Sequence, residues 1–462
     1  MSECGIHSRN MYRRDFIKKS AQVTGALAMT QLVPLSASPT KRRFTLAAVG
    51  DCILTRKVSN ISEPRFIKLV ELLRDADCAL GNCEMTVGDA ERFEPTPKGG
   101  DMNLICPPFG ADELAWMGFD LMGCANNHAM DYGSSGLLST VEQLNRVGIA
   151  SAGTGQTLAR ASAPSYVDTP AGRVALINCA SSFPEWSLAE NARADSNGRP
   201  GINPLRVDAT YRLEPGLFQE LKKIDGAFKS QVGQGQVAQS SAPTDELFFL
   251  GKRFIPGPTE ILRTARQPDI SRVTQAIKIA RRNSRLVTVM IHEHALYRPS
   301  SFLQLFARAC IDAGADAFFG SGPHVVGAIE LYQGKPICYS LGNFFFQYET
   351  LRQIPTEVYE ANRLDINTPD PSVSYDVLSN NHFNERSYWE SSVVRMQFSG
   401  SQLTEFTLHP IVLGWNEPRF SRGLPILGTE REGEPIIKRI SDQSKAFGTR
   451  IDVRDEVGHV GL

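Results

Sequence analysis

From residue 43 onward, short apolar runs alternate with segments whose apolar residues recur at helical spacing. The apolar run at 44–49 predicts a buried strand, and Phe66, Leu69, Val70 and Leu73 share one face of a predicted helix. This alternation predicts an α/β fold with a largely parallel central sheet and helices on both of its faces. Further strands are expected at 78–80, 119–124, 173–179, 285–291, 316–319, 325–331, 337–340, 393–398 and 403–408, and further helices at 111–117, 134–147, 271–282, 301–313 and 434–445.

Two stretches interrupt the alternation. Residues 182–267 are rich in Gly, Pro, Asn, Gln and Ser, and we expect an irregular insertion with a local helix near 217–229. Residues 347–389 form a second expected insertion. Long loops in compact domains are usually functional or disordered. The pattern therefore predicts one domain over 44–415 that carries both insertions, followed by a C-terminal tail over 416–462.

The first 38 residues have the pattern of an export signal. The adjacent Arg13 and Arg14, with Phe16 two positions on, precede a mildly apolar segment at 20–35 and small residues at 36–38. This order is typical of a twin-arginine signal peptide. It predicts an exported, periplasmic or extracytoplasmic protein whose partners include the twin-arginine export machinery. An ordinary basic amphipathic start is the alternative. No later segment of the chain has the pattern of a transmembrane helix.

Composition narrows the class of protein. Apolar residues make up 42% of the chain, enough for a sizeable core, and the formal net charge of −1 gives no electrostatic footprint for nucleic acid. The nine cysteines include no Cys-x-x-Cys pair. We interpret them as small buried hydrophobes, not as a disulfide framework or zinc fingers.

Polar residues follow the predicted strands directly. Asn126, Asn127, His128 and Asp131 come after the run at 119–124. Ligands of open α/β sheets bind beyond the carboxyl ends of the strands, where such side chains can converge. The simpler interpretation is a polar turn whose asparagines cap the next helix.

The same arrangement recurs after four other strands. Asp51, Glu84, His292 with His294, and His324 each follow an apolar run. Singly, each could be a turn residue, a surface charge or a packed loop histidine. Their recurrence at strand ends predicts one shared site instead. Carboxylates, amides and imidazoles suit Mn, Fe, Zn or Mg, so the sequence predicts a divalent metal, as one or two ions.

Several motifs in this order resemble the CapA family of poly-γ-glutamate capsule biosynthesis proteins, which is similar to the calcineurin-like metallophosphoesterases. The resemblance covers roughly residues 44–410. It rests on Gly50-Asp51-Cys52-Ile53-Leu54-Thr55-Arg56, Asn82-Cys83-Glu84, Ala125-Asn126-Asn127-His128 with Asp131-Tyr132-Gly133, Gly153-Thr154-Gly155, Pro323-His324-Val325, and Tyr339-Ser340-Leu341-Gly342-Asn343-Phe344.

This resemblance implies a four-layer α/β sandwich of the metallophosphoesterase-like type, with a metal centre at the strand ends. His128 is implied to protonate a leaving group or hold a phosphate, and Asp131 to orient it. Arg56 is implied to pair with an anionic substrate group, since guanidinium matches carboxylate and phosphate geometry. We also assign Asn126 and Asn343 to substrate binding. The implied metal ligands are Asp51, Glu84, Asn127, His292 and His324.

The chain departs from the phosphoesterase pattern at three ligand positions. Cys52 and Ile53 follow Asp51 where the family has Asp-x-His, and Glu84 stands where a bridging Asp is usual. Gly322 replaces the first imidazole of His-Pro-His, and His294 is a candidate replacement. These changes leave a one-metal and a two-metal centre equally open.

Two functions are compatible with these residues. The first is a metal-dependent hydrolase that acts on a phosphoester or a related anionic substrate. The second is a non-catalytic accessory factor that binds or transports an anionic capsule polymer. Cleavage or formation of a γ-glutamyl amide would use the same residues as the first.

Overall fold

The computed structural model describes residues 43–99, 101–231, 245–294, 298–351, 353–367 and 371–462. The signal segment expected at 1–38 lies outside these ranges. Within them, no helix combines the length and the hydropathy that a membrane span needs.

A ten-stranded sheet is built around β1 (Arg43–Ile53). Successive side chains of a strand point to opposite faces, so Leu46 packs into the core between the sheets and Ala47 into the outer core. The other strands of this sheet are β2 (Cys78–Cys83), β5 (Leu121–Gly123), β6 (Ala150–Ala152), β19 (Asn343–Phe346), β20 (Glu390–Ser399), β21 (Gln402–Val412), β22 (Ile426–Leu427), β23 (Ile451–Arg454) and β24 (Val457–Val460).

A six-stranded sheet is built around β15 (Leu286–His292), all seven residues of which are buried. Burial on both faces explains why this strand is a continuous apolar run and not an alternating one. The other strands are β8 (Ser165–Thr169), β9 (Gly172–Ala180), β16 (Ala317–Ser321), β17 (Ile329–Tyr332) and β18 (Lys335–Cys338).

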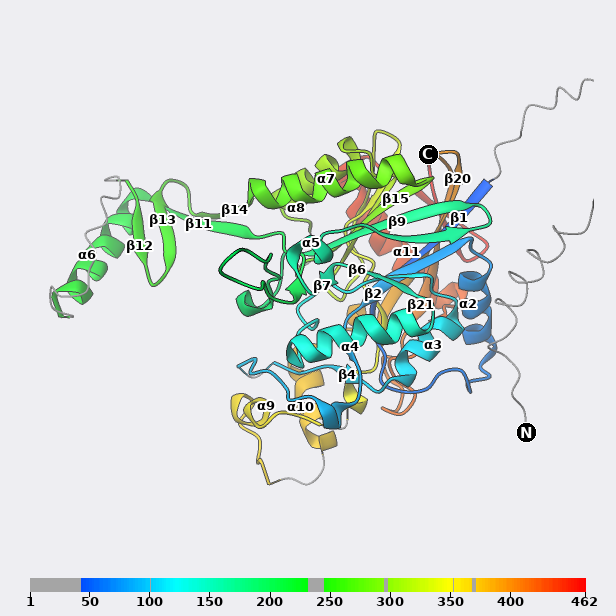
Figure 1. Ribbon diagram of the computed structural model, residues 1–462, viewed down its shortest axis with the longest axis horizontal. Coiled ribbons are helices and arrows are strands. Elements are labelled where there is room, and N and C mark those ends of the chain that lie inside the picture. The colour runs from blue at the N-terminus through cyan, green and yellow to red at the C-terminus, as the bar shows by residue number, and fades with distance from the viewer. Residues whose placement is uncertain (1–42, 100, 232–244, 295–297, 352, 368–370) are drawn as a thin grey trace, which may run out of the picture. The chain divides into compact units, whose positions relative to one another are not determined.

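The two sheets face each other, and helices cover their outer faces (Figure 1). Phe66 and Leu69 of one helix join the outer core of the larger sheet, and Val273 and Phe302 join that of the smaller sheet. The fold is therefore the four-layer α/β sandwich that the resemblance implied. The covering helices are α2 (Pro64–Arg74), α3 (Phe109–Met117) and α4 (Gly133–Arg146) on the larger sheet, and α7 (Gln267–Asn283) and α8 (Ser301–Asp312) on the smaller sheet.

The strand and helix pattern by itself led to a single central sheet, and that prediction was wrong. Both sheets are made of alternating strands and helices, so the linear pattern is the same for one sheet or two. The division appears only in the pairing: β1 pairs with β2, β19 and β20, whereas β9 pairs with β8 and β15.

The insertions are more regular than their composition indicated. The first contains the expected helix, α6 (Pro215–Gln231), but also a separate four-stranded sheet. The second contains α9 (Thr356–Ala361), α10 (Pro371–His382) and a 3-10 helix, η4 (Arg386–Trp389). The sheet of the first insertion consists of β11 (Val207–Leu213), β12 (Leu247–Phe249), β13 (Lys252–Pro256) and β14 (Glu260–Ala265).

The segment expected as a C-terminal tail is part of the domain. Residues 416–462 contain α11 (Glu430–Ser444), which begins with a capping box between Thr429 and Glu432. Its apolar face, with Ile436 and Ile440, joins the core between the sheets. The hairpin β23–β24 then pairs with β21 and extends the larger sheet. The charged composition of this segment therefore reflects its exposed faces and not a lack of structure.

Candidate metal centre

The predicted site residues lie at the carboxyl ends of parallel strands from both sheets. Asp51 lies near the end of β1, and Glu84 directly follows β2. His292 is the last residue of β15, and His324 lies three residues beyond β16. β1 runs parallel to β2, and β15 runs parallel to β16. The sandwich therefore brings ligand-type side chains from its two sheets to one edge.

Glu84 is shared by two groups of possible metal ligands. One consists of Glu84, His292 and His294, and the other of Asp51, Glu84 and His324. Within each group the donor atoms lie within 4.8 Å of one another. Glu84 Oε1 is 3.4 Å from His292 Nε2 and 3.9 Å from His324 Nε2. Ligand atoms about 2 Å from one ion are separated by up to about 4 Å, so these distances fit a shared cation.

The two carboxylates differ in their hydrogen bonding. Asp51 Oδ1 accepts from Asn82 Nδ2 at 2.7 Å, and Oδ2 accepts from the Gly322 amide at 3.0 Å. Both Glu84 oxygens are buried and have no hydrogen-bond partner among the described residues. Burial, followed by the nearby Asp51, raises the pKa of Glu84 well above its usual value. Because a buried carboxylate without partners is costly, the position fits a cation ligand.

The three imidazoles are held in the neutral form that binds metals. Burial lowers the pKa of His292 well below its usual value, and the neighbouring His294 lowers it further. Burial also lowers the pKa of His324, although Asp51 acts in the opposite direction. Desolvation by the surrounding chain and then His324 lower the pKa of His294 to about 3, even though solvent reaches part of this residue. The Nε2 atoms of His292 and His294 are 2.9 Å apart, so their lone pairs can converge on one ion.

A buried amide lies behind this cluster. Asn82 Nδ2 donates to Asp51 and lies 3.2 Å from His292 Nδ1, and its Oδ1 accepts from Asn126 Nδ2 at 3.3 Å. His292 Nδ1 is also 3.1 Å from Ser321 Oγ. Ser321 Oγ donates to the Ile291 carbonyl oxygen and can therefore accept the hydrogen of Nδ1, and such a partner orients a metal ligand and leaves its other nitrogen for the ion. Nε2 is the atom of His292 that faces Glu84.

The loop after β5 forms a second part of the site. Asn127 Oδ1 is buried with no hydrogen-bond partner in the described chain, as expected for a ligand oxygen. His128 Nδ1 is 2.7 Å from Asp131 Oδ2, and Asp131 is fully buried. A carboxylate holding one imidazole nitrogen leaves the other, Nε2, for proton transfer. The geometry is the one expected for a histidine oriented by an aspartate.

Lys98 is a site residue that the sequence reasoning missed. Its Nζ lies 2.9 Å from Asp131 Oδ1 and 3.0 Å from His128 Nδ1, and only 4% of its side chain is exposed. Asp131 keeps the pKa of Lys98 above its usual value despite the opposing effect of burial. The sequence shows one lysine in a charged loop. Only the return of this loop onto Asp131, through Thr96 N to Asp131 O at 2.8 Å, brings it into the site.

The three residues assigned to substrate binding make hydrogen bonds within the protein. Asn126 is fully buried, and its side chain donates to Cys83 O and accepts from the His128 amide, so it shapes the turn. Asn343 is fully buried and bonded to His324. Arg56 donates to the backbone carbonyl oxygens of Arg419 and Arg422, so its guanidinium supports a loop. The motifs identify these residues, but they do not show which atoms the side chains contact.

Comparison with known proteins decides the family. A family model described as bacterial capsule synthesis protein PGA_cap matches residues 45–348. The chain belongs to this family. The family is part of the metallophosphoesterase-like superfamily, in agreement with the four-layer sandwich and with the position of the candidate ligands.

The relatives include proteins named for capsule synthesis. The chain is 25% identical over 344 residues to the PGA biosynthesis protein CapA of Bacillus subtilis (strain 168), covering 70% of this chain and 72% of that one. It is 23% identical over 322 residues to the capsule biosynthesis protein CapA of Bacillus anthracis, covering 67% and 62%. The uncharacterized protein y4sH of Sinorhizobium fredii (strain NBRC 101917 / NGR234) is 35% identical over 437 residues, covering 91% and 93%. The predicted resemblance to CapA is therefore confirmed.

Proposed function

We propose that the protein is an exported, metal-dependent hydrolase that acts on a phosphoester or a related anionic substrate during capsule polymer synthesis. The observation that carries the proposal is the buried Glu84 carboxylate, which lacks hydrogen-bond partners in the described chain and faces the imidazoles of His292 and His324. The names of the CapA relatives support the link to capsule synthesis.

Most of the site residues would act as metal ligands. Asp51, Glu84, His292, His294 and His324 would hold the metal, with Asn127 as a further candidate ligand. A divalent cation there supplies a Lewis acid that lowers the pKa of a bound water and neutralises charge on the substrate. Two carboxylates balance one divalent ion, and an anionic substrate would add the negative charge that a second ion requires.

His128 supplies the proton chemistry in this proposal. Asp131 accepts from Nδ1 and fixes the ring, so Nε2 can pass its proton to the leaving oxygen. Lys98 neutralises the charge of Asp131 through its 2.9 Å contact with Oδ1, and its Nζ also lies 3.0 Å from His128 Nδ1. The substrate class is defined only by its negative charge, which includes phosphoesters and γ-glutamyl chains.

The test combines metal analysis with hydrolysis. Purified protein is assayed on p-nitrophenyl phosphate, on bis-p-nitrophenyl phosphate and on γ-glutamyl peptides, with Mn²⁺, Fe²⁺, Zn²⁺ or Mg²⁺ added. We expect His128→Ala to lower kcat by about 10²- to 10⁴-fold while the metal content stays unchanged. His459→Ala, on β24, is the matched control. Activity that survives EDTA, or a His128→Ala variant with wild-type kcat, would refute hydrolysis at this site.

The accessory role is the second candidate, because the CapA relatives are named for synthesis and not for hydrolysis. It predicts that the protein binds an anionic polymer such as poly-γ-glutamate in EDTA and after Asp51→Asn. If polymer binding and hydrolysis both disappear in EDTA, the accessory role is excluded.

Export is proposed to depend on the twin arginines. Replacing Arg13 and Arg14 by lysine should leave the protein in the cytoplasm of a bacterial host, whereas the wild-type chain reaches the periplasm or the cell exterior. Fractionation with a cytoplasmic marker measures this. Equal export of both forms would rule out the twin-arginine route.

A further inference from the structure

His324, on the loop after β16, is hydrogen-bonded to Asn343 of β19. Asn343 is the first residue of β19, lies opposite Asp51 of β1 in the parallel pairing, and is fully buried. His324 Nδ1 is 2.8 Å from Asn343 Oδ1, and Asn343 Nδ2 donates to the backbone carbonyl oxygen of His324 at 3.2 Å. One amide therefore contacts both the ring and the backbone of a single candidate ligand.

A third hydrogen bond fixes the orientation of this amide. Asn343 Nδ2 also donates to the carbonyl oxygen of Tyr388 at 2.9 Å, so it lies between two oxygens that only accept. Rotating the amide by 180° would place its oxygen against both carbonyls. Oδ1 therefore faces His324, and Nδ1 must carry the ring hydrogen. Nε2 keeps its lone pair, 3.9 Å from Glu84 Oε1.

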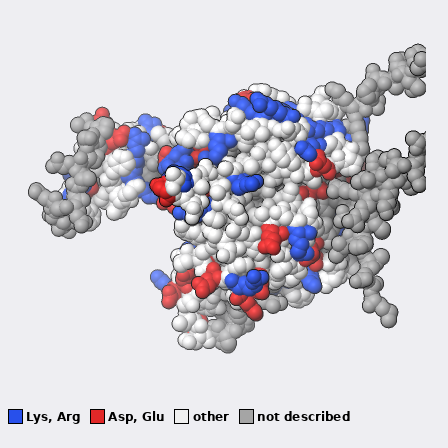
Figure 2. Space-filling view, viewed as in Figure 1, with Lys and Arg blue, Asp and Glu red and all other residues white. Residues whose placement is uncertain are grey.

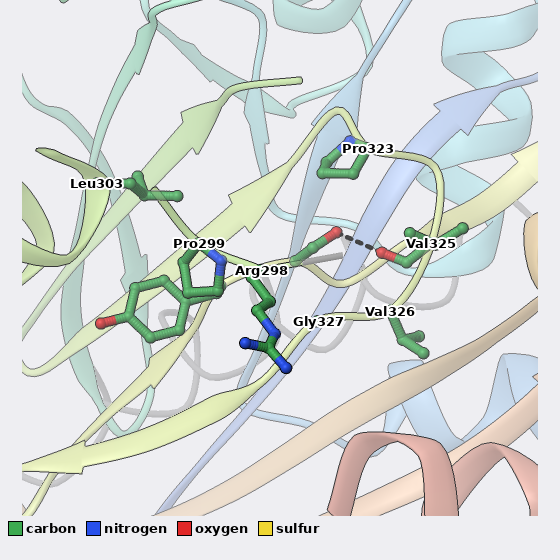
Figure 3. Close-up of a pocket in the computed structure, with 9 residues that line it drawn as sticks. Arg298, Pro299, Leu303, Pro323, Val325, Val326 and Gly327 are labelled. Carbon is green, nitrogen blue, oxygen red and sulfur yellow. Dashed lines mark hydrogen bonds between the residues drawn. The ribbon is translucent and has the colours of Figure 1, made fainter. Parts of the chain in front are cut away.

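His324 needs such support because its backbone is strained. Its φ is +60°, a left-handed conformation that residues other than glycine rarely adopt and keep only where their surroundings impose it. The ring packs against Phe346 at 5.4 Å and Phe383 at 5.9 Å between centroids. Ser340 Oγ donates to the Val325 carbonyl oxygen at 2.7 Å and holds the next turn of the same loop (Figure 3). The segment 340–343 thus holds the loop at two points.

We propose that Asn343 is a positioning residue of the metal centre that sets the tautomer and orientation of His324. Through Tyr388 it also connects the second insertion, residues 347–389, to the centre. The proposal rests on the proposed metal-dependent function, since His324 acts there as a ligand. It replaces the substrate-binding role that the sequence indicated for Asn343.

Zn²⁺ affinity of the full-length protein, measured by competition with a chromophoric chelator, tests the proposal. Asn343→Leu removes all three hydrogen bonds, and we expect it to weaken Zn²⁺ binding by about 10- to 100-fold, as is usual for partners of metal ligands. Asn343→Asp keeps an oxygen for Nδ1 but places a carboxylate against two carbonyls. It should therefore weaken binding while keeping the tautomer.

Asn203→Leu is the matched control. Asn203 is fully buried and makes two side-chain hydrogen bonds, to Asn178 O and from Arg272 Nε, but neither partner is an imidazole. It should lower the melting temperature of the metal-free protein as Asn343→Leu does, with Zn²⁺ affinity unchanged. The proposal is overturned if Asn343→Leu and Asn343→Asp bind Zn²⁺ within twofold of wild type, or if Asn203→Leu loses as much affinity.

A second readout keeps the two proposals separate. Two-bond ¹H–¹⁵N spectra of the metal-free protein report which nitrogen of His324 carries the hydrogen. We expect the Nδ1–H form in the wild type and in Asn343→Asp, and a shift toward Nε2–H in Asn343→Leu. If the wild type binds no Zn²⁺, the metal-dependent function fails while this spectrum still decides the role of Asn343. An unchanged tautomer in Asn343→Leu refutes it.

Discussion

Replacing Glu84 by glutamine should make the metal-free protein more stable and less able to bind metal. The change removes the charge and keeps the shape of the side chain. In the metal-free state the carboxyl group is buried, neither oxygen accepts a hydrogen bond from the described residues, and burial opposes its ionisation by raising its pKa. Glu84 is also the residue common to both groups of possible ligands, so its carboxylate would help to hold a bound cation. One substitution therefore acts with opposite signs on stability and on binding.

The magnitude follows from proton linkage. Burial raises the pKa of Glu84 above its usual 4.5, so ionisation favours the unfolded chain at any pH above that value. One pKa unit corresponds to about 1.4 kcal/mol, and pH 7 lies about 2.5 units above 4.5, so the destabilisation has a ceiling of about 3.5 kcal/mol. Part of the gain is lost because the new amide hydrogens need acceptors. We expect a net gain of about 1 to 3 kcal/mol, or roughly 1 to 3 °C for a domain of this size.

Thermal unfolding in EDTA at pH 7 and at pH 4.5 measures the gain, which should disappear at the lower pH. Glu113→Gln is the control with the opposite sign. Glu113 is also buried, but its oxygens accept from Val58 N, Ser59 N and Ser59 Oγ, so its replacement should destabilise the protein. The reasoning fails if Glu84→Gln destabilises the metal-free protein as Glu113→Gln does, or if it binds Zn²⁺ with wild-type affinity.

Three further outcomes follow from the contacts. Lys98→Met leaves the buried charge of Asp131 without its lysine partner, and should lower the free energy of unfolding, measured in urea, by about 3 to 5 kcal/mol, whereas Lys98→Arg should retain most of it. Burial lowers the pKa of His409 to about 4, so the folded chain binds a proton there less readily than the unfolded chain and loses stability as the pH falls from 6.5 toward 4. His409→Gln removes this loss. The difference in the free energy of unfolding between pH 7 and pH 4, measured in urea, should shrink by up to about 3 kcal/mol. Arg56→Ala should lower the melting temperature but leave the KM for an anionic substrate unchanged; a raised KM with unchanged stability would restore its substrate role.

The strand ends were predictable because buried strands and metal ligands require different residue types. A buried strand must be apolar, and a ligand must be polar, so Asp51, Glu84 and His292 stand out where one pattern meets the other. The pairing of strands does not require particular residue types, so it cannot be recognised in the same way. Nothing in the runs around β1 and β9 shows that they belong to different sheets.

The contents of the insertions were hidden for a different reason. β14 is exposed over five of its six residues, so it lacks the apolar face by which a strand is recognised. The contacts of Lys98 and Asn343 could not be predicted because their partners lie about 30 and 20 residues away in the chain. A side chain that contacts one ligand and no substrate has no composition signature of its own.

The charged residues on the surface agree with the near-zero net charge of the sequence. The near-zero net charge predicts no dominant field, and lysine and arginine are interspersed with aspartate and glutamate on the face seen in Figure 2. An anionic substrate of the proposed kind would therefore be attracted by local groups at the site and not by the protein as a whole.

The arrangement of the larger sheet limits how the chain can be divided. The family match ends at residue 348, yet β20 and β21 lie beyond it. β20 pairs with β1 from Arg43 to Ala48, so a fragment ending at residue 348 would expose a long apolar strand edge. Such edges promote aggregation. The segment matched by the family model is thus not a complete folding unit, because β20 beyond it covers this edge of β1.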